Sequence, residues 1–117
     1  MDDARAAELL AAERERITEE LERLEAEFRP DAADTAADEV ASGDGAVDLT
    51  ERTRDLDRIE ALRQELAAVE RAEARLAAGT YGLSIESGAP ISDARLERIP
   101  TAERTADEQR EWERLGG

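Results

Sequence analysis

Apolar residues recur in the first part of the chain with the spacing of a helical seam. Residues 3 to 28 are rich in Ala, Leu, Glu and Arg and contain no Gly or Pro. Their seam positions, separated by 7, 4, 3 and 4 residues, are Leu10, Ile17, Leu21, Leu24 and Phe28. This heptad-like spacing among good helix formers predicts an amphipathic helix, and Pro30 marks its end or a break in it.

A second seam with a similar period follows after residue 48. Its apolar positions are Leu56, Ile59, Leu62, Leu66, Val69 and Leu76. Glu73 is the one misfit in this stripe. Asp48 and Glu51 have the spacing of a capping box at the start of a helix, and Gly79 suits the residue after its end. Two helices with one narrow stripe each are best buried against each other, which predicts an antiparallel hairpin, although an intermolecular bundle remains an alternative.

The stretch between the two predicted helices is acidic, rich in Ala and largely without apolar period. Residues 42 to 45 predict a turn, because Ser and Gly cluster there. We therefore predict a mainly all-α chain with a coiled-coil hairpin over residues 1–78, whose acidic tip loop covers residues 29–47. Residues 79–117 form a second unit, which is too short to fold unaided without a disulfide, a metal or a docking partner, and must pack on the hairpin.

The composition narrows the possible functions. The chain has no Cys and no His, which excludes disulfides, thiolate metal sites and the usual catalytic triads, so we expect no enzyme and no cofactor. Its net charge is −15, with 31 acidic and 16 basic residues, all of the latter Arg. This charge disfavours direct binding to nucleic acid or to an anionic membrane and favours a basic protein surface or Mg²⁺.

The apolar runs and the first residues of the sequence predict neither a membrane-spanning helix nor a secretory signal. No apolar run approaches the roughly 20 residues that a bilayer-spanning helix requires. The first residues, MDDARAAELL, are acidic and lack the basic region of a secretory signal. We therefore expect a cytoplasmic protein.

A glycine- and proline-punctuated segment, GTYGLSIESGAPISDARLERIPTAERTADEQ, covers residues 79–109. It resembles the C-terminal zinc finger of the DksA/TraR family, whose pattern is G-T-Y-G-x-C-x-x-C-G-x-P-I, then R-L-E-x-x-P-T-A, then C-x-x-C. The shared positions are Gly79, Thr80, Tyr81, Gly82, Gly88, Pro90, Ile91, Arg95, Leu96, Glu97, Pro100, Thr101 and Ala102. The four cysteine positions of the family carry Ser84, Ser87, Thr105 and Glu108 in this chain.

The residues at the former ligand positions predict a finger without metal that ends in a short helix. One carboxylate and a few hydroxyls make a poor site for zinc or iron. Thr105 and Glu108 instead have the T-x-x-E spacing of a capping box that would begin the last helix. A cap contributes about 1 kcal/mol and structural zinc on the order of 10 kcal/mol. Most of the difference is expected to come from apolar packing of Leu83, Ile85, Ile99 and Trp112.

The resemblance implies a role in transcription. DksA/TraR proteins bind RNA polymerase, insert their coiled coil into its secondary channel, and present an acidic D-x-x-D-x-A tip near the catalytic centre. A literal match is Asp31, Asp34 and Ala36. Counting back without gaps from Tyr81 instead places the second Asp and the Ala of the motif on Asp44 and Ala46. Both placements stay open, as does a solvated connector with no contact role.

Carboxylates on such a tip could accept hydrogen bonds from basic polymerase residues or hold Mg²⁺. Family members also respond to guanosine tetraphosphate through basic residues on the second helix and the finger. Counted without gaps, the corresponding helix segment is residues 61–68, in which only Arg63 is basic. We therefore expect a weak or absent response to this nucleotide.

Two classes of function are compatible with these features of the sequence. The resemblance favours a transcription regulator that binds the secondary channel of RNA polymerase through its acidic tip. The alternative is a coiled-coil adaptor that has lost polymerase function and self-associates at micromolar concentration through Leu10, Ile17, Leu62 and Leu66. An acidic mimic of nucleic acid is compatible with the charge but has no motif in its favour.

Overall fold

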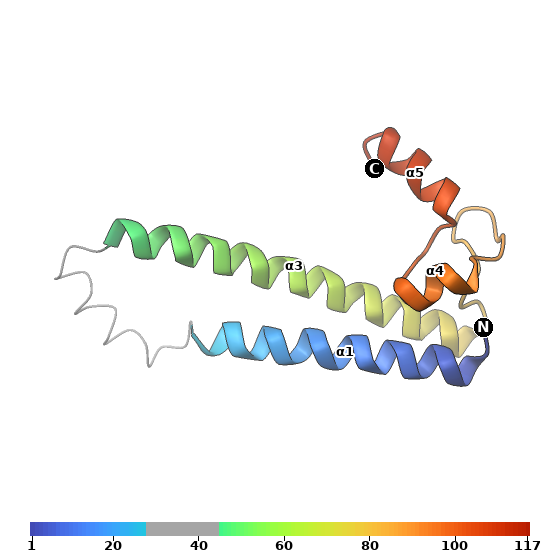
Figure 1. The fold of residues 1–117 in the computed structure, drawn as a ribbon, viewed down its shortest axis with the longest axis horizontal. Helices are drawn as coiled ribbons and strands as arrows, with labels where there is room; N and C mark the ends of the chain where they lie inside the picture. The colour runs from blue at the N-terminus through green and yellow to red at the C-terminus, as the bar shows by residue number, and fades with distance from the viewer. Residues whose placement is uncertain (28–44) are drawn as a thin grey trace. The chain divides into compact units, whose positions relative to one another are not determined.

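The computed structural model describes residues 1–27 and 45–117, with residues 45–48 placed by their backbone alone. Its helices are α1 (Asp3–Ala26), α3 (Gly45–Ala78), α4 (Asp93–Arg98) and α5 (Ala106–Arg114) (Figure 1). Within these described ranges the extended backbone amounts to one isolated antiparallel bridge between Leu83 and Pro90. The predicted all-helical class, built on an antiparallel helical pair, is confirmed.

The chain divides into two compact units, one made of residues 1–15 and 67–117 and the other of residues 16–66. The helices α1 and α3 each pass from one unit into the other, and within each unit they run antiparallel (Figure 1). The division that the sequence motifs suggested, at residue 79, follows the finger pattern rather than these units and stays a prediction.

The unit of residues 16–66 has a core one layer thick between α1 and α3. Ile17 and Leu21 of α1 and Ile59 and Leu62 of α3 are buried. Leu56 was predicted to continue this seam but is 54% exposed. Its exposure has a simple cause, since α1 ends at Ala26 and the described chain offers no further helical turn against that part of α3.

Ion pairs flank this thin core on both sides. The guanidinium of Arg58 lies 2.9 Å from the Glu20 carboxylate, and that of Arg63 lies 2.8 Å from Glu25. These side chains are between a quarter and about three fifths exposed. Exposed pairs of this kind typically contribute less than about 1 kcal/mol each, so the apolar seam carries most of the stability of the unit.

The ends of α3 differ in how well the sequence predicted them. The helix begins at Gly45, so Asp48 lies inside it and the predicted capping box at Asp48 and Glu51 is wrong. The predicted end is confirmed, because Gly79 follows the helix with φ of +77°. Its N–H donates to the carbonyl of Leu76, and the N–H of Thr80 donates to that of Arg75. This pair of bonds is a Schellman motif, which satisfies the last carbonyls of the helix.

In the unit of residues 1–15 and 67–117, α1 and α3 bury Ala6, Leu10, Val69 and Ala72. Glu73, the misfit in the predicted seam, has a partner here. The Arg14 guanidinium donates to both of its carboxylate oxygens, at 2.6 and 3.2 Å. This hydrogen bond lowers the pKa of Glu73 below its usual value, so the residue stays ionised at the edge of the seam.

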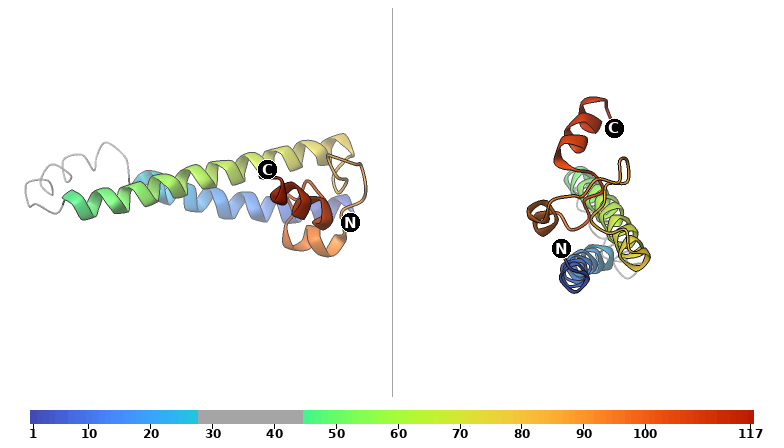
Figure 2. Two further views of the ribbon diagram at one scale, coloured as in Figure 1. Left: turned by 90° about the horizontal axis from the view of Figure 1, so that it is seen from above. Right: turned by 90° about the vertical axis from the view of Figure 1, so that its right-hand side faces the viewer.

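The C-terminal part of this unit has a small core of its own. Ile91, Leu96 and Ala102 are buried there, and Met1 and Tyr81 pack against them. The helix α4 lies beside the first turns of α1 (Figure 2), where the Arg5 guanidinium is 2.8 Å from the Glu97 carboxylate. The finger segment therefore packs on the helical pair, as its short length predicted.

The apolar residues predicted to hold the finger in place of zinc are not its core. Leu83, Ile85, Ile99 and Trp112 are 38–51% exposed, so that prediction is wrong. For Leu83 and Ile85 the reason is local: Ser84 between them is buried, and consecutive side chains of extended backbone point to opposite sides. Trp112 lies on α5, a helix with no buried residue.

Candidate functional site

The first former ligand pair lies in a tight turn. Gly82 and Gly88 have φ of +83° and +75°, a left-handed conformation that glycine adopts without strain. Backbone bonds close the turn, since the N–H of Ser84 donates to the carbonyl of Ala89 at 2.8 Å and the N–H of Gly88 donates back to Ser84 at 2.9 Å. The two glycines and these backbone bonds thus set the path of the chain around Ser84 and Ser87.

The Ser84 side chain is turned into this loop. Its residue is 5% exposed, and its hydroxyl oxygen accepts hydrogen bonds from the backbone N–H groups of Glu86 and Ser87, at 3.1 and 3.3 Å. The Ser87 hydroxyl accepts one from the N–H of Ala89 at 3.2 Å. Both serines therefore satisfy backbone donors of the turn and still have a hydroxyl proton to give.

The second former ligand pair begins α5. The Thr105 hydroxyl accepts from the N–H of Glu108 at 3.2 Å, and the Glu108 carboxylate accepts from the N–H of Thr105 at 2.9 Å. This is the reciprocal capping box that the T-x-x-E spacing predicted. The first four N–H groups of a helix have no partner within it. The Thr105 hydroxyl accepts one of them, which favours the start of α5 at this point.

The Glu108 carboxylate is stabilised in its charged form. It accepts the N–H of Thr105 at 2.9 Å. The Ser87 side chain, the Thr105 backbone and the Ser84 side chain, in that order of size, lower the pKa of Glu108 to about 2. We call Ser84, Ser87, Thr105 and Glu108 the serine–glutamate cluster, and sequence reasoning identified all four residues and the cap.

This cluster does not fit a zinc ion. Zinc in structural sites takes thiolates and imidazoles, whereas the cluster offers three neutral hydroxyls and one carboxylate. The hydroxyls are also engaged, since each accepts a backbone N–H. Among the residues that the structure describes, no group of three or more His, Cys, Asp or Glu is placed to hold a metal.

A second polar group connects the finger to α3. The Glu103 carboxylate lies 3.1 Å from the guanidinium groups of both Arg71 and Arg75, and the carbonyl of Glu103 accepts the N–H of Ile85 at 2.9 Å. Burial raises the pKa of Glu103, but the hydrogen bond and charge of Arg71, with the charge of Arg75, outweigh burial and lower it overall. The loop that precedes α5 is thus bonded to both the turn and α3.

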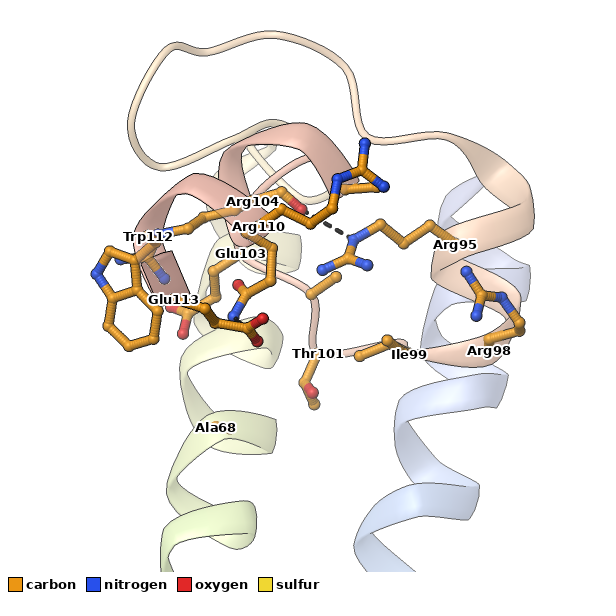
Figure 3. A pocket seen from close by; sticks show the side chains of 13 residues that line it. Ala68, Arg95, Arg98, Ile99, Thr101, Glu103, Arg104, Arg110, Trp112 and Glu113 are labelled. Atoms are coloured by element: carbon orange, nitrogen blue, oxygen red, sulfur yellow. Dashed lines mark hydrogen bonds between the residues drawn. The ribbon is translucent and has the colours of Figure 1, made fainter. Parts of the chain in front are cut away.

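A groove of about 600 Å³ lies between α3, α4 and α5 (Figure 3). Four arginines from α4, α5 and the loop between them line it, together with the half-exposed Trp112. They are Arg95, Arg98, Arg104 and Arg110. The Arg95 side chain donates to the carbonyl of Arg104 at 3.0 Å, and the Arg104 guanidinium lies 4.3 Å from the centre of the Trp112 ring.

Sequence reasoning missed this groove. Its arginines are spread over residues 95–110, and the turn between α4 and α5 gathers them around one hollow (Figure 3). The groove is not purely basic, because Arg104 is paired with Glu86 and Arg110 with Asp107. Glu103 and Glu113 also line it.

The predicted tip residues are not part of the described site. Asp31, Asp34, Ala36 and Asp44 lie outside the described residues, and Ala46 lies in α3, where the backbone alone is placed. Arg63, the one basic residue predicted to face guanosine tetraphosphate, is bonded to Glu25. The weak response to this nucleotide stays a prediction.

No helix in residues 1–27 and 45–117 has both the length and the apolar character needed to cross a membrane. No family model matches the sequence. Over 90 residues, or 77% of the chain, it is 38% identical to the RNA polymerase-binding transcription factor DksA of two strains of Caulobacter vibrioides. The chain spans 56% of the length of these relatives.

A solved structure gives the same assignment. Transcription factor DksA2 from Pseudomonas aeruginosa matches with a TM-score of 0.68 and 29% sequence identity, over 97% of this chain and 84% of that one. The match includes the helical pair and the finger, where the glycines, Tyr81 and the R-L-E and P-T-A segments of the family pattern are present. By sequence identity, by fold and by this pattern, the chain belongs to the DksA/TraR family.

Proposed function

We propose that this protein binds RNA polymerase and regulates transcription without catalysing a reaction. The observation that carries the proposal is the 38% identity to proteins named as RNA polymerase-binding transcription factors, combined with the fold shared with transcription factor DksA2. The composition agrees with this role, since a chain without Cys or His and with a charge of −15 is better suited to a protein surface than to catalysis or DNA.

The proposed route of binding is the secondary channel of the polymerase, which the family resemblance implies. The antiparallel pairing of α1 and α3 within each unit supports it, because such a helical pair is what the resemblance leads us to expect of a coiled coil that enters the channel. The acidic residues of the loop would then act on basic groups near the catalytic centre. Asp31, Asp34 and Ala36 are the preferred tip, with Asp44 and Ala46 as the other placement.

The self-associating adaptor has no observation in its favour. Of the four residues through which it would associate, Leu10, Ile17 and Leu62 are at most 1% exposed, because α1 and α3 bury them against each other within each unit. The fourth, Leu66, is partly buried. Self-association through these residues would require the helical pair to open. We therefore carry the polymerase-binding function forward alone.

The test is co-purification of the protein with core RNA polymerase, with a known secondary-channel factor as competitor. Binding that the competitor displaces is the expected result. No binding at tens of micromolar, or binding that the competitor leaves unchanged, would contradict the proposed route. The second result would still leave polymerase as the partner, so the two failures can be told apart.

The tip is tested separately in a transcription assay. Changing both Asp31 and Asp34 to Asn should abolish the transcriptional effect while binding is retained, because Asn keeps the size of Asp and removes its charge. Asp44→Asn is the matched variant for the other placement. If Asp44→Asn alone removes the effect, the tip is the Asp44 and Ala46 set.

A further inference from the structure

The helix α5 has little apolar packing to hold it in the finger. It spans Ala106–Arg114 and has no buried residue. The buried core of the finger, Ile91, Leu96 and Ala102, lies entirely before α5 in the chain. Zinc at the four cysteine positions of the family pattern would join the turn to the start of α5, but the residues at these positions in this chain do not fit it. Another contact is therefore needed to fix α5 against the turn.

We propose that Arg104 positions α5, by joining the turn at residues 82–88 to Trp112 on the helix. Its Nε donates to the Glu86 carboxylate of the turn at 2.8 Å. The same guanidinium lies over the Trp112 ring, 4.3 Å from its centre. We call Glu86, Arg104 and Trp112 the arginine clamp. All three belong to the unit of residues 1–15 and 67–117, and the inference does not depend on the proposed polymerase binding.

A guanidinium is suited to hold both partners at once. It is planar, so its edge can donate to a carboxylate while its face stacks on an aromatic ring. A hydrogen bond to an ionised carboxylate is roughly twice as strong as one between neutral groups. The Arg104 side chain is only 16% exposed, so little water competes for its contacts, and a cation over a ring is held more strongly when water is excluded.

The backbone around Arg104 fixes the point from which its side chain extends. The carbonyl of Glu103 accepts the N–H of Ile85 at 2.9 Å, and the Glu103 carboxylate pairs with two arginines of α3. The carbonyl of Arg104 accepts the Nε of Arg95, from α4, at 3.0 Å. The loop is thus bonded to the turn, to α3 and to α4 immediately before α5 begins. The arginine clamp extends this network to the helix itself.

The position of α5 also shapes the groove between α3, α4 and α5. Gln109, Trp112 and Glu113 line the groove from α5, and Ala68 lines it from α3 (Figure 3). Because α5 buries no residue, its side of the groove depends on polar contacts such as the clamp. Loss of the clamp should leave α5 helical, since its capping box is local, and release it from the groove.

Arg104→Met tests the clamp, with Trp112, the sole tryptophan, as the reporter. Trp112 is 38% exposed in the folded protein, so its release should raise the acrylamide quenching constant of its fluorescence roughly twofold. Arg98→Met is the matched control, because it removes the same charge from the same groove. Among the described residues, the Arg98 guanidinium has no ion-pair partner. Far-ultraviolet circular dichroism should show unchanged helix content in both variants.

Glu86→Gln separates release of α5 from the mere removal of a cover over the ring. It leaves the Arg104 guanidinium in the chain and replaces its ionised partner by a neutral amide, which weakens the hydrogen bond. Quenching of Trp112 should still rise, although less than in Arg104→Met. The double variant should match Arg104→Met alone, because both changes break the same link. Additive increases would mean that the two residues act separately and would contradict the clamp.

Arg104→Lys provides a rescue by a conservative change. Lysine keeps a cation that can reach the Glu86 carboxylate, but it lacks the planar face that stacks on Trp112. Its quenching constant should therefore lie between those of the unmodified protein and Arg104→Met. If Arg104→Met fails to fold, the test passes to Arg104→Lys and to Glu86→Gln, whose side chain is 42% exposed.

Three results would overturn the inference. The first is equal Trp112 quenching in Arg104→Met and Arg98→Met. The second is quenching in Glu86→Gln equal to that of the unmodified protein, which would mean that Arg104 only covers the ring. The third is an increase in quenching when the unmodified protein is treated with a chelator, which would mean that a metal holds α5.

Discussion

Replacing Leu62 with Ala should destabilise the protein far more than the identical change at Leu56. Both leucines belong to the predicted seam of α3, and both lie in the unit of residues 16–66. Leu62 is fully buried, whereas Leu56 is 54% exposed. Leu and Ala differ little in helix propensity, so the comparison isolates the packing of each side chain.

The expected magnitudes follow from burial. Full burial of a leucine side chain is worth about 1.5–3 kcal/mol, and the cavity left by truncation raises the loss at Leu62 to about 2–5 kcal/mol. About half of Leu56 remains in water, so its truncation should cost about half of the burial value, or about 0.8–1.5 kcal/mol. A loss of the larger size is a substantial part of the roughly 5–15 kcal/mol that stabilises a domain.

Urea denaturation followed by far-ultraviolet circular dichroism measures both variants. The midpoint should fall strongly for Leu62→Ala and little for Leu56→Ala, with an unchanged slope against urea concentration. Equal shifts in the two variants would refute the packing described for this unit. A larger shift at Leu56 would mean that α3 presents a different face to α1.

Three further substitutions test other contacts by thermal or urea denaturation. Gly82→Ala should cost about 1–2 kcal/mol through its left-handed backbone alone, because the added Cβ would lie an unstrained 3.5 Å from Leu96. Glu103→Gln should destabilise the protein at neutral pH by about 1–3 kcal/mol. Because the pKa of Glu103 is lowered, this difference should be complete above the ordinary 4.5 of a glutamate, shrink below it, and be lost as the pH falls through the lowered pKa. Glu73→Gln should cost less than about 1 kcal/mol, and still less at high salt, because its pair with Arg14 is about two fifths exposed.

The hydrophobic period and the capping motifs predicted those features of the helices that depend only on local sequence. The heptad-like spacing of Leu10 and Ile17 identified the first helix, and Gly79 and the T-x-x-E box at Thr105 identified a helix end and a helix start. Each of these signals acts within a few residues, so no knowledge of the fold was needed. The start of α3 was missed because Asp48 has the right spacing for a cap but lies inside the helix.

The burial of individual residues in the finger could not be predicted from a repeating hydrophobic pattern. In a short irregular segment, the direction of each side chain depends on backbone angles rather than on a repeating period. Ser84 is therefore buried while its apolar neighbours Leu83 and Ile85 are half exposed. The arginine groove was missed for a similar reason, because its lining depends on how α4, α5 and the loop between them are placed.

Several residues of the finger pattern have roles in the fold that do not involve a metal. Ile91, Leu96 and Ala102 form the buried core, and the Tyr81 hydroxyl donates to the carbonyl of Pro100 at 2.7 Å. Gly82 supplies a backbone conformation that other residues adopt only with strain.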